Sequence, residues 1–209
     1  MRNLNLYAQQ GRSMIEMLGV LAIIGVLSVG GIAGFSKAMD SYKTNEINEQ
    51  ISTIIANVRN VGLRQGGSYR GLTVAAAKKM KLIPPELINS SGNLVHAYGG
   101  AVEIGSSKQL YNSSLTNEKD FVVVYKSLLR AQCMQILSKG WGGPKMAVVA
   151  AGDNSPNSAK YLESHPSASE CKTSGKVAVC YNKEMPIDTI SKGCSCGKTP
   201  SCAIAIWVY

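Results

Sequence analysis

The stretch MIEMLGVLAIIGVLSVGGIAGFSKAM, residues 14–39, decides the fold of this chain. It contains 20 consecutive uncharged residues, from Met17 to Ser36, in a chain of 209 residues. As an α-helix, such a run extends about 30 Å, the thickness of the hydrocarbon core of a bilayer. The sequence after Lys37 has the mixed polarity of a water-soluble domain. The stretch therefore predicts a helix that can cross a membrane, followed by a globular domain.

The helix is expected to continue beyond this apolar run. Apolar residues recur at helical spacing in the polar sequence that follows, and no proline occurs before Pro84. They form a stripe along one side of a helix: Ile47, Ile51, Ile54, Ile55, Val58 and Val61. We predict one helix of roughly 50 residues, from near Ser13 to near Val61 and ended by Gly62. Its first half is apolar all round and its second half is one-sided.

Five glycines lie in the apolar half: Gly19, Gly25, Gly30, Gly31 and Gly34. Each weakens a helix by about 1 kcal/mol relative to alanine. Two interpretations stay open, close packing between helices through small residues and local stretching of the helix when copies pack together.

The apolar run does not fit an ordinary cleaved secretion signal. It is longer than the ~7–15 residues of a signal-peptide core, and no A-x-A cleavage site follows it. Arg2 and Arg12 precede the run, and cysteine-rich sequence follows it. This asymmetry favours a cytoplasmic N-terminus with the remainder outside. A bitopic, membrane-anchored binding protein is one interpretation of the pattern.

Glu16 is a single carboxylate at the start of this apolar segment. A charge at membrane depth costs a few kcal/mol unless it lies near the interface or is paired. Near the end of a span, Glu16 could reach the interface by itself. It also lies five residues after Gly11, so cleavage after Gly11 would give Arg12 a new α-amine. The carboxylate of one copy could then pair with the α-amine of a neighbouring copy.

The segment GRSMIEMLGVLAIIGVLSVGGIAGFSKAM, from Gly11 to Met39, resembles the prepilin signature of type IV pilins. The resemblance implies cleavage after Gly11 by prepilin peptidase, methylation of the new N-terminus, and pairing of Glu16 with the Arg12 amine of an adjacent subunit. The family usually has Phe, Met or Leu where this chain has Arg12. The implied domains are 1–11, a leader; 12–36, a transmembrane and polymerisation segment; 37–62, an amphipathic half-helix; and 63–209, a globular pilin head.

The remaining sequence predicts an α+β head. Helical segments are expected at Thr73–Leu82 and in SLLRAQCMQILSK. Strands are expected in AVEIG, FVVVY, KMAVVAA, KVAVCY and CAIAIWVY. The expected fold is a long N-terminal helical spine packed on an antiparallel sheet, with a disulfide-closed C-terminal region. This order resembles type IVb pilins, the class that includes toxin-coregulated pilin and the enterobacterial type IVb fimbrial pilins.

The chain has six cysteines: Cys133, Cys171, Cys180, Cys194, Cys196 and Cys202. An even number after an export-like N-terminus predicts disulfides in an oxidising compartment. The type IVb resemblance implies a Cys133–Cys196 bond that closes the C-terminal region. Bonds Cys171–Cys180, across a hairpin, and Cys194–Cys202 are then expected for the other four cysteines.

No catalytic, metal or cofactor site is expected. The formal net charge is +9 and is spread along the chain. It indicates either a solvated basic surface or attraction to anionic surfaces or DNA, without a specific nucleic-acid motif. His96 and His165 are expected at the surface. Trp141 is interpreted either as a packed anchor or as an exposed contact residue.

The resemblance implies a structural role rather than an enzyme. The chain is expected in the inner membrane before assembly, with a cytoplasmic N-terminus, and in an extracellular adhesive filament afterwards. The implied partners are identical pilin subunits, prepilin peptidase and the inner-membrane assembly machinery, with host or bacterial surfaces as a further class. The alternatives are a minor pilin, a type II secretion pseudopilin and the bitopic binding protein.

Overall fold

The computed structural model describes residues 7–110, 118–143, 145–152, 170–197 and 199–209, with side chains of the first helix from Met14 onward. The chain divides into two units, Met1–Tyr42 and Lys43–Tyr209, and each is described by itself. The second unit is called the head below.

Helix α1 spans Tyr7–Arg64, 58 residues, and so contributes to both units. It begins earlier than the expected start near Ser13. The residues from Tyr7 onward include an alanine and two glutamines, which favour helix, and no proline. Gly11 alone weakens the helix by only about 1 kcal/mol, which does not end it.

The prediction that Gly62 ends this helix is wrong. Gly62 lies inside α1 and is buried, and a Cβ atom at this position would overlap the ring of Tyr69. The helix ends instead before Gly66 and Gly67, whose φ angles are +70° and +80°. The amide of Gly67 donates to the carbonyl of Gly62 at 2.8 Å. Glycine in the left-handed region is the usual way to close a helix, so Gly62 serves packing and the later pair serves termination.

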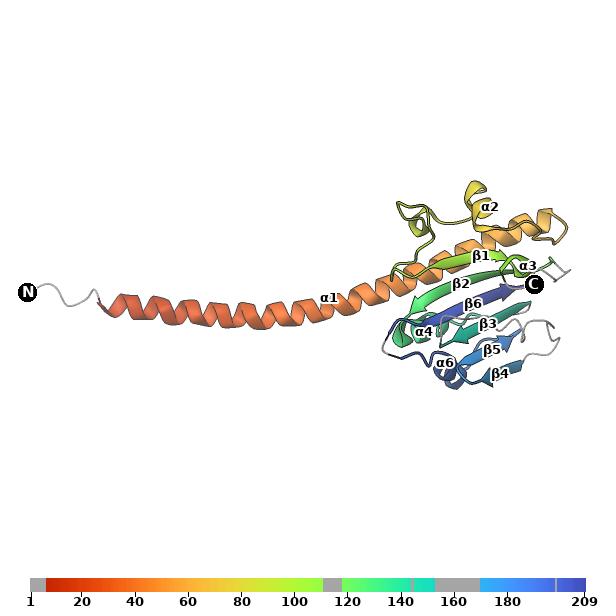
Figure 1. Ribbon diagram of the computed structural model, residues 1–209. Helices are drawn as coiled ribbons and strands as arrows, with labels where there is room; N and C mark the ends of the chain where they lie inside the picture. The colour runs from red at the N-terminus through yellow and green to blue at the C-terminus, as the bar shows by residue number, and fades with distance from the viewer. Residues whose placement is uncertain (1–6, 111–117, 144, 153–169, 198) are drawn as a thin grey trace, which may run out of the picture. The chain divides into compact units, whose positions relative to one another are not determined.

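The described strands form one six-stranded antiparallel sheet in the order β1-β2-β6-β3-β5-β4 (Figure 1). They are β1 (Val102–Ser106), β2 (Phe121–Leu128), β3 (Met146–Ala151), β4 (Glu170–Ser174), β5 (Val177–Tyr181) and β6 (Cys202–Val208). Strand β6 pairs with β2 on one side and β3 on the other; Trp207 lies opposite Val122 and Ala147. The strand that follows all others in the chain therefore lies inside the sheet.

One face of the sheet carries the main core. The buried stripe of α1 packs there together with α4 (Arg130–Leu137) and α6 (Ile187–Gly193). Val123 and Ile206 point to this face, whereas Val122 and Trp207 point to the other, where a second cluster is buried. Alternation of this kind follows from the two-residue period of a strand. The expected α+β fold, with a helical spine on an antiparallel sheet, is confirmed.

The segment between α1 and β1 holds short elements, α2 (Val74–Lys79) and the 3₁₀ helix η1 (Pro85–Leu87). Helix α2 is shorter than the expected Thr73–Leu82. Thr73 is its N-cap, accepting a hydrogen bond from the amide of Ala76 at 3.1 Å. The helix stops because Lys81 has a φ of +53°, outside the helical region. A short α3 (Ser107–Leu110) follows β1.

Helix α6 was not expected from the sequence. It lies close against the sheet, because a Cβ atom on Gly193 would approach the Cβ atoms of Ala150 and Ala178 to 2.6 and 2.8 Å. Only a residue without a side chain allows this approach, and both facing residues are alanine. Strands β3 and β5 thus fix the end of α6 on the sheet.

Gly193→Ala should lower the free energy of unfolding of the head by about 1–3 kcal/mol, because the added methyl overpacks a contact between rigid atoms. Gly197→Ala is the matched control, since nothing lies within 4 Å of that position. Chemical denaturation of the full chain in detergent measures both. Equal stability of the two variants would contradict the close approach of α6.

Candidate assembly segment and the disulfide-closed head

The first unit presents an apolar surface on all sides. Every described side chain from Met14 to Tyr42 is exposed, including Ile15 at 74%, Val26 at 75% and Phe35 at 66%. By length and composition, this part of α1 could cross a membrane. Monomeric soluble proteins rarely expose apolar surface of this extent, so the segment requires a lipid or protein partner.

Glu16 lies on α1 within this segment, and its side chain is exposed. Gly11 and Arg12 lie in the helical backbone of α1, and the Arg12 side chain falls outside the described part of the chain. The structure therefore places the predicted processing residues, Gly11 and Arg12, and the predicted assembly residue, Glu16, within two turns of one helix. Their roles stay predictions.

The five glycines of the apolar half do not pack against this chain. Apart from their chain neighbours and the backbone of α1 itself, no atom lies within 4 Å of a Cβ placed on any of them, and α1 is continuous through all five. Because glycine has no side chain, these positions form shallow depressions on the surface of α1, where a second helix could approach closely.

Three disulfides close the head, and two predicted pairings are wrong. Cys133 is bonded to Cys194, not to Cys196, and Cys196 is bonded to Cys202. The physical reason is the packing of α6 on the sheet, described above. It places Cys194, the C-cap of α6, against α4, which carries Cys133. Cys196 then lies next to the start of β6.

The third bond joins Cys171 on β4 to Cys180 on β5. The two residues lie directly opposite each other in the antiparallel pair, with Cα atoms 4.1 Å apart. Gly175, with a φ of +57°, begins the tight turn between the strands. The bond thus clips the edge hairpin of the sheet.

His96 is buried, with 2% of its surface exposed, which corrects the expectation of a surface position. Its Nε2 lies 2.8 Å from the carbonyl oxygen of Lys126, and its Nδ1 accepts the amide of Tyr98 at 3.2 Å. The ring is therefore neutral, with its proton on Nε2. Burial lowers the pKa of His96, and the hydrogen bond to the Lys126 carbonyl opposes this effect. His165 lies outside the described residues.

A polar cluster holds the first turn of α1 in the head. The hydroxyl of Thr44 is buried, donates to Gln135 Oε1 on α4 at 3.1 Å, and lies 3.0 Å from the hydroxyl of Tyr98. Asn48 lies one turn further along α1. Its Oδ1 accepts a hydrogen bond at 2.9 Å from Nε1 of Trp141, which packs against the core. Of the two interpretations of Trp141, the structure favours the packed anchor.

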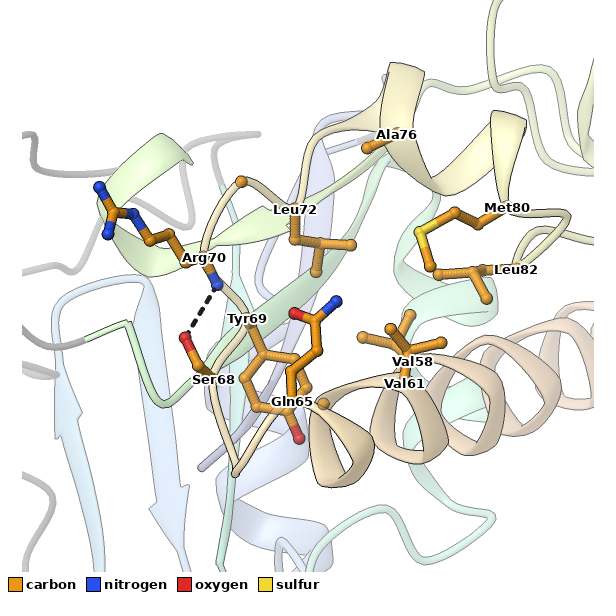
Figure 2. Close-up of a pocket in the computed structure, with 12 residues that line it drawn as sticks. Val58, Val61, Gln65, Ser68, Tyr69, Arg70, Leu72, Ala76, Met80 and Leu82 are labelled. Carbon is orange, nitrogen blue, oxygen red and sulfur yellow. Dashed lines mark hydrogen bonds between the residues drawn. The ribbon is translucent and has the colours of Figure 1, made fainter.

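A small pocket lies beside the end of α1 (Figure 2). Val58, Leu72, Met80 and Leu82 supply apolar walls, and the Tyr69 ring closes one side. Burial raises the pKa of the Tyr69 phenol, opposed by the positive charge of Arg59. The pocket volume is ≈ 50 Å³. Cofactor sites typically enclose about 300–1,000 Å³, so this pocket suits no more than one apolar side chain.

Within the described residues, no group of three or more His, Cys, Asp or Glu side chains is arranged to hold a metal ion. All six cysteines are in disulfides. The sulfur atoms are therefore structural rather than metal ligands.

Comparison with protein families matches residues 41–195 to the family described as PilS N terminal. The match covers 155 of the 209 residues. The chain belongs to this family of type IV pilins. The crystal structure of TcpA, a type IV pilin from Vibrio cholerae El Tor biotype, is similar to this pilin with a TM-score of 0.52 and 12% sequence identity. The similarity covers 80% of this chain and 99% of TcpA.

The structural similarity supports the pilin fold, and the family and fold are those of structural proteins. A search of curated protein sequences finds no match to this pilin. The family match runs from Ser41 to Ser195 and so covers the head up to the residues before β6. The apolar segment that precedes it is described by its own composition and exposure.

Replacing Cys133 and Cys194 together by serine should lower the unfolding free energy of the pilin head by about 4 kcal/mol, because their bond spans 61 residues. The same replacement of Cys171 and Cys180, which span 9 residues, should cost about 2.5 kcal/mol. Chemical denaturation of the full chain measures both losses. A greater loss for the shorter loop would contradict the loop-length argument.

Acidification from about pH 7 to about pH 5 should destabilise the head through His96. The pKa of His96 is lowered in the fold, so the unfolded chain binds more protons below about pH 6.5 and the stabilisation is lost as the pH falls. His96→Gln keeps a donor and an acceptor but does not titrate.

The difference in unfolding free energy between wild type and His96→Gln, measured at both pH values, isolates this contribution from the carboxyl groups that both chains share. The variant should lose less stability on acidification. The same pH dependence in both chains would show that His96 is not held neutral.

Proposed function

We propose that this pilin is the structural subunit of a type IV pilus, a filament in which copies pack through the apolar half of α1. The observation that carries the proposal is the apolar surface from Met14 to Phe35, on which every large apolar side chain is more than half exposed. Such a surface is stable in a bilayer or against other apolar helices. In the proposal, this apolar surface lies in the bilayer before assembly and packs against other copies of the chain in the filament. The glycines of this half allow neighbouring helices to approach closely.

The proposal assigns a processing step to the N-terminus. Residues 1–11 form a leader that prepilin peptidase removes after Gly11, and Arg12 becomes the methylated N-terminal residue. Segment 12–36 then serves membrane insertion and polymerisation, 37–62 is the amphipathic half-helix, and 63–209 is the globular pilin domain that follows it. Arg2 and Arg12 support a cytoplasmic N-terminus in the inner membrane before assembly.

In the proposed filament, Glu16 determines the register in which neighbouring α1 helices pack. An unpaired carboxylate among apolar side chains costs a few kcal/mol, and so does an unpaired α-amine. Pairing Glu16 of one copy with the Arg12 α-amine of the next removes both penalties at one relative position of the two helices. Other positions leave two buried charges, so the pair selects the register of the filament.

The proposed partners are identical subunits, prepilin peptidase and the inner-membrane assembly machinery. The assembled filament would lie outside the cell, where its surface serves adhesion to host or bacterial surfaces. The disulfides suit this exterior, because oxidising compartments preserve them.

Glu16→Ala should leave the chain inserted and cleaved but abolish its incorporation into filaments, because the α-amine of the next subunit loses its partner. The amount of pilin in filaments sheared from cells, relative to the membrane pool, measures incorporation. Mass spectrometry of the N-terminus checks cleavage.

Glu49→Ala is the matched control, since Glu49 is an exposed carboxylate on the head part of α1. It should assemble normally. Gly11→Ala should block cleavage and so separate a processing defect from a pairing defect. Normal filaments from Glu16→Ala would remove the charge-pairing argument.

A further inference from the structure

A second and larger hollow on the head lies between α2 and the edge strand β1 (Figure 1). It is lined by residues of α2, of the loop that follows η1, and of the chain where β1 begins. Its volume is ≈ 440 Å³, against ≈ 50 Å³ for the pocket of Figure 2. Small-molecule sites typically enclose about 300–1,000 Å³, so this hollow, called the α2 groove below, has the size of a ligand site.

Much of the lining of the α2 groove is aliphatic. The side chains come from three parts of the head: Val74 of α2, Leu94 and Val95 of the loop, and Ala101 and Val102 at the beginning of β1. Leu94 and Val102 are buried, and the amide of Val102 donates to the carbonyl of Leu94 at 3.0 Å. The sheet therefore holds this part of the lining in place.

Lys78 supplies the one charged side chain of the described lining. It lies one turn after Val74 on α2 and donates from Nζ to the carbonyl oxygen of Gly92, across the groove entrance residues of the loop. Within the described residues, no carboxylate forms an ion pair with Lys78. A carbonyl oxygen occupies only one of the N–H donors of an ammonium group. Lys78 thus keeps its other donors and its whole charge for a further partner.

Two asparagines add amide groups to the lining, Asn89 and Asn93. Asn89 Oδ1 accepts the backbone amides of Ser91 and Asn93 at 3.1 and 2.8 Å, which fixes the orientation of its side chain. Among the residues that the structure describes, Asn89 Nδ2 and the Asn93 side chain have no protein hydrogen-bond partner. The groove therefore offers amide donors and an amide acceptor beside one ammonium group.

The lining contains no carboxylate that competes for the charge of Lys78. The segment 71–103 contains three basic residues, Lys78, Lys79 and Lys81, and two acidic residues, Glu86 and Glu103. Neither acid lines the groove. Glu103 is already paired with Lys126, at 2.6 Å between Oε1 and Nζ. An anionic group in the groove therefore meets a positive charge and no facing negative one.

We propose that the α2 groove binds a sugar ring that carries a carboxylate. The carboxylate pairs with Lys78, the ring hydroxyls bond to the amides of Asn89 and Asn93, and the C–H face of the ring packs on the aliphatic lining. Hydroxyl groups donate and accept hydrogen bonds, as the two amide side chains do. A phosphate only accepts, and arginine forks are its usual partners; the lining has none.

This inference deepens the proposed function and rests on it for its biological use, because it names a class of molecule to which the filament adheres. Acidic sugars occur on animal cell surfaces and in bacterial polysaccharides, the two kinds of surface proposed above. One groove with one ammonium contact binds weakly. A filament repeats the groove in every copy, and many linked sites bind a polymer of such sugars far more tightly than one site does.

Titration of the full-length chain tests the groove before any filament forms. The chain is labelled with the nitrogen-15 isotope and kept in a non-ionic detergent that has no sugar headgroup. Galacturonate, a component of bacterial polysaccharides, and N-acetylneuraminate, which is typical of animal cell surfaces, are added separately. NMR should show saturable shifts of the amides of Gly92, Leu94 and Gly99 with at least one of them, and the lower Kd identifies the source. Galactose, the neutral counterpart of galacturonate, should bind at least about tenfold more weakly.

Lys78→Gln should raise the Kd of the acidic sugar at least about tenfold, because it removes the charge but keeps a donor for the Gly92 carbonyl. Lys79→Gln is the matched control. It makes the same change of charge at the next residue of α2, which is exposed and does not line the groove. Its Kd should equal that of the unaltered chain. Asn93→Ala removes an exposed amide without a protein partner, so it should weaken binding and leave the unfolding free energy unchanged.

Equal weakening by Lys78→Gln and Lys79→Gln would overturn the inference, since general attraction to a basic head would then explain the binding. Equal affinity for galactose would do the same. Identical shifts with acetate or inorganic phosphate at the same concentrations would show that any small anion suffices, which also overturns it. So would the absence of saturable shifts with both acidic sugars. None of these results bears on polymerisation, which the filament yield of Glu16→Ala tests separately.

Discussion

The head depends on the burial of one stripe of α1 against one face of the sheet. Ile47, Ile51 and Ile54 are fully buried there, and each such side chain stabilises the fold by roughly 1.5–3 kcal/mol. The same helix has no comparable partner in its first half, where every described side chain is exposed. The polar cluster around Thr44 lies at the beginning of the buried part. One continuous helix thus serves a soluble domain in one half and requires an apolar environment in the other.

Helical periodicity was sufficient to predict this division, and the composition of short apolar runs was sufficient to predict most of the sheet. The isoleucine stripe and the runs FVVVY and CAIAIWVY carry strong local signals, and all three form the expected elements. The missed features are set by distant contacts. Helix α6 has only 7 residues and no side-chain N-cap, so little in its own sequence marks it. Burial of His96 is possible because the carbonyl of Lys126, 30 residues away, accepts a hydrogen bond from its ring, and no local sequence pattern reports this contact.

The candidate site shows the same contrast. Gly11 and Glu16 were predicted from their spacing along one helix, which a sequence records directly, and their roles stay predictions. The disulfide pairs depend on where α6 lies, because Cys194 and Cys196 are separated by one residue and only the packing of Gly193 decides which of them meets Cys133. The pocket beside Met80 joins two segments across a turn, and the α2 groove joins α2 to a loop and to the beginning of β1. Such surfaces emerge from tertiary structure.

The position of β6 has a consequence for how the head is made. Strands β1 and β2 form one pair and β3, β4 and β5 form another group, and only β6 joins them. Residues 202–208 follow both groups in the chain, so the two halves of the sheet stay unconnected until this strand has been synthesised. Contacts between segments so distant in sequence form slowly. A head that lacks β6 therefore leaves β2 and β3 each with an unpaired edge, and an unpaired edge of this kind can pair with a strand of another chain.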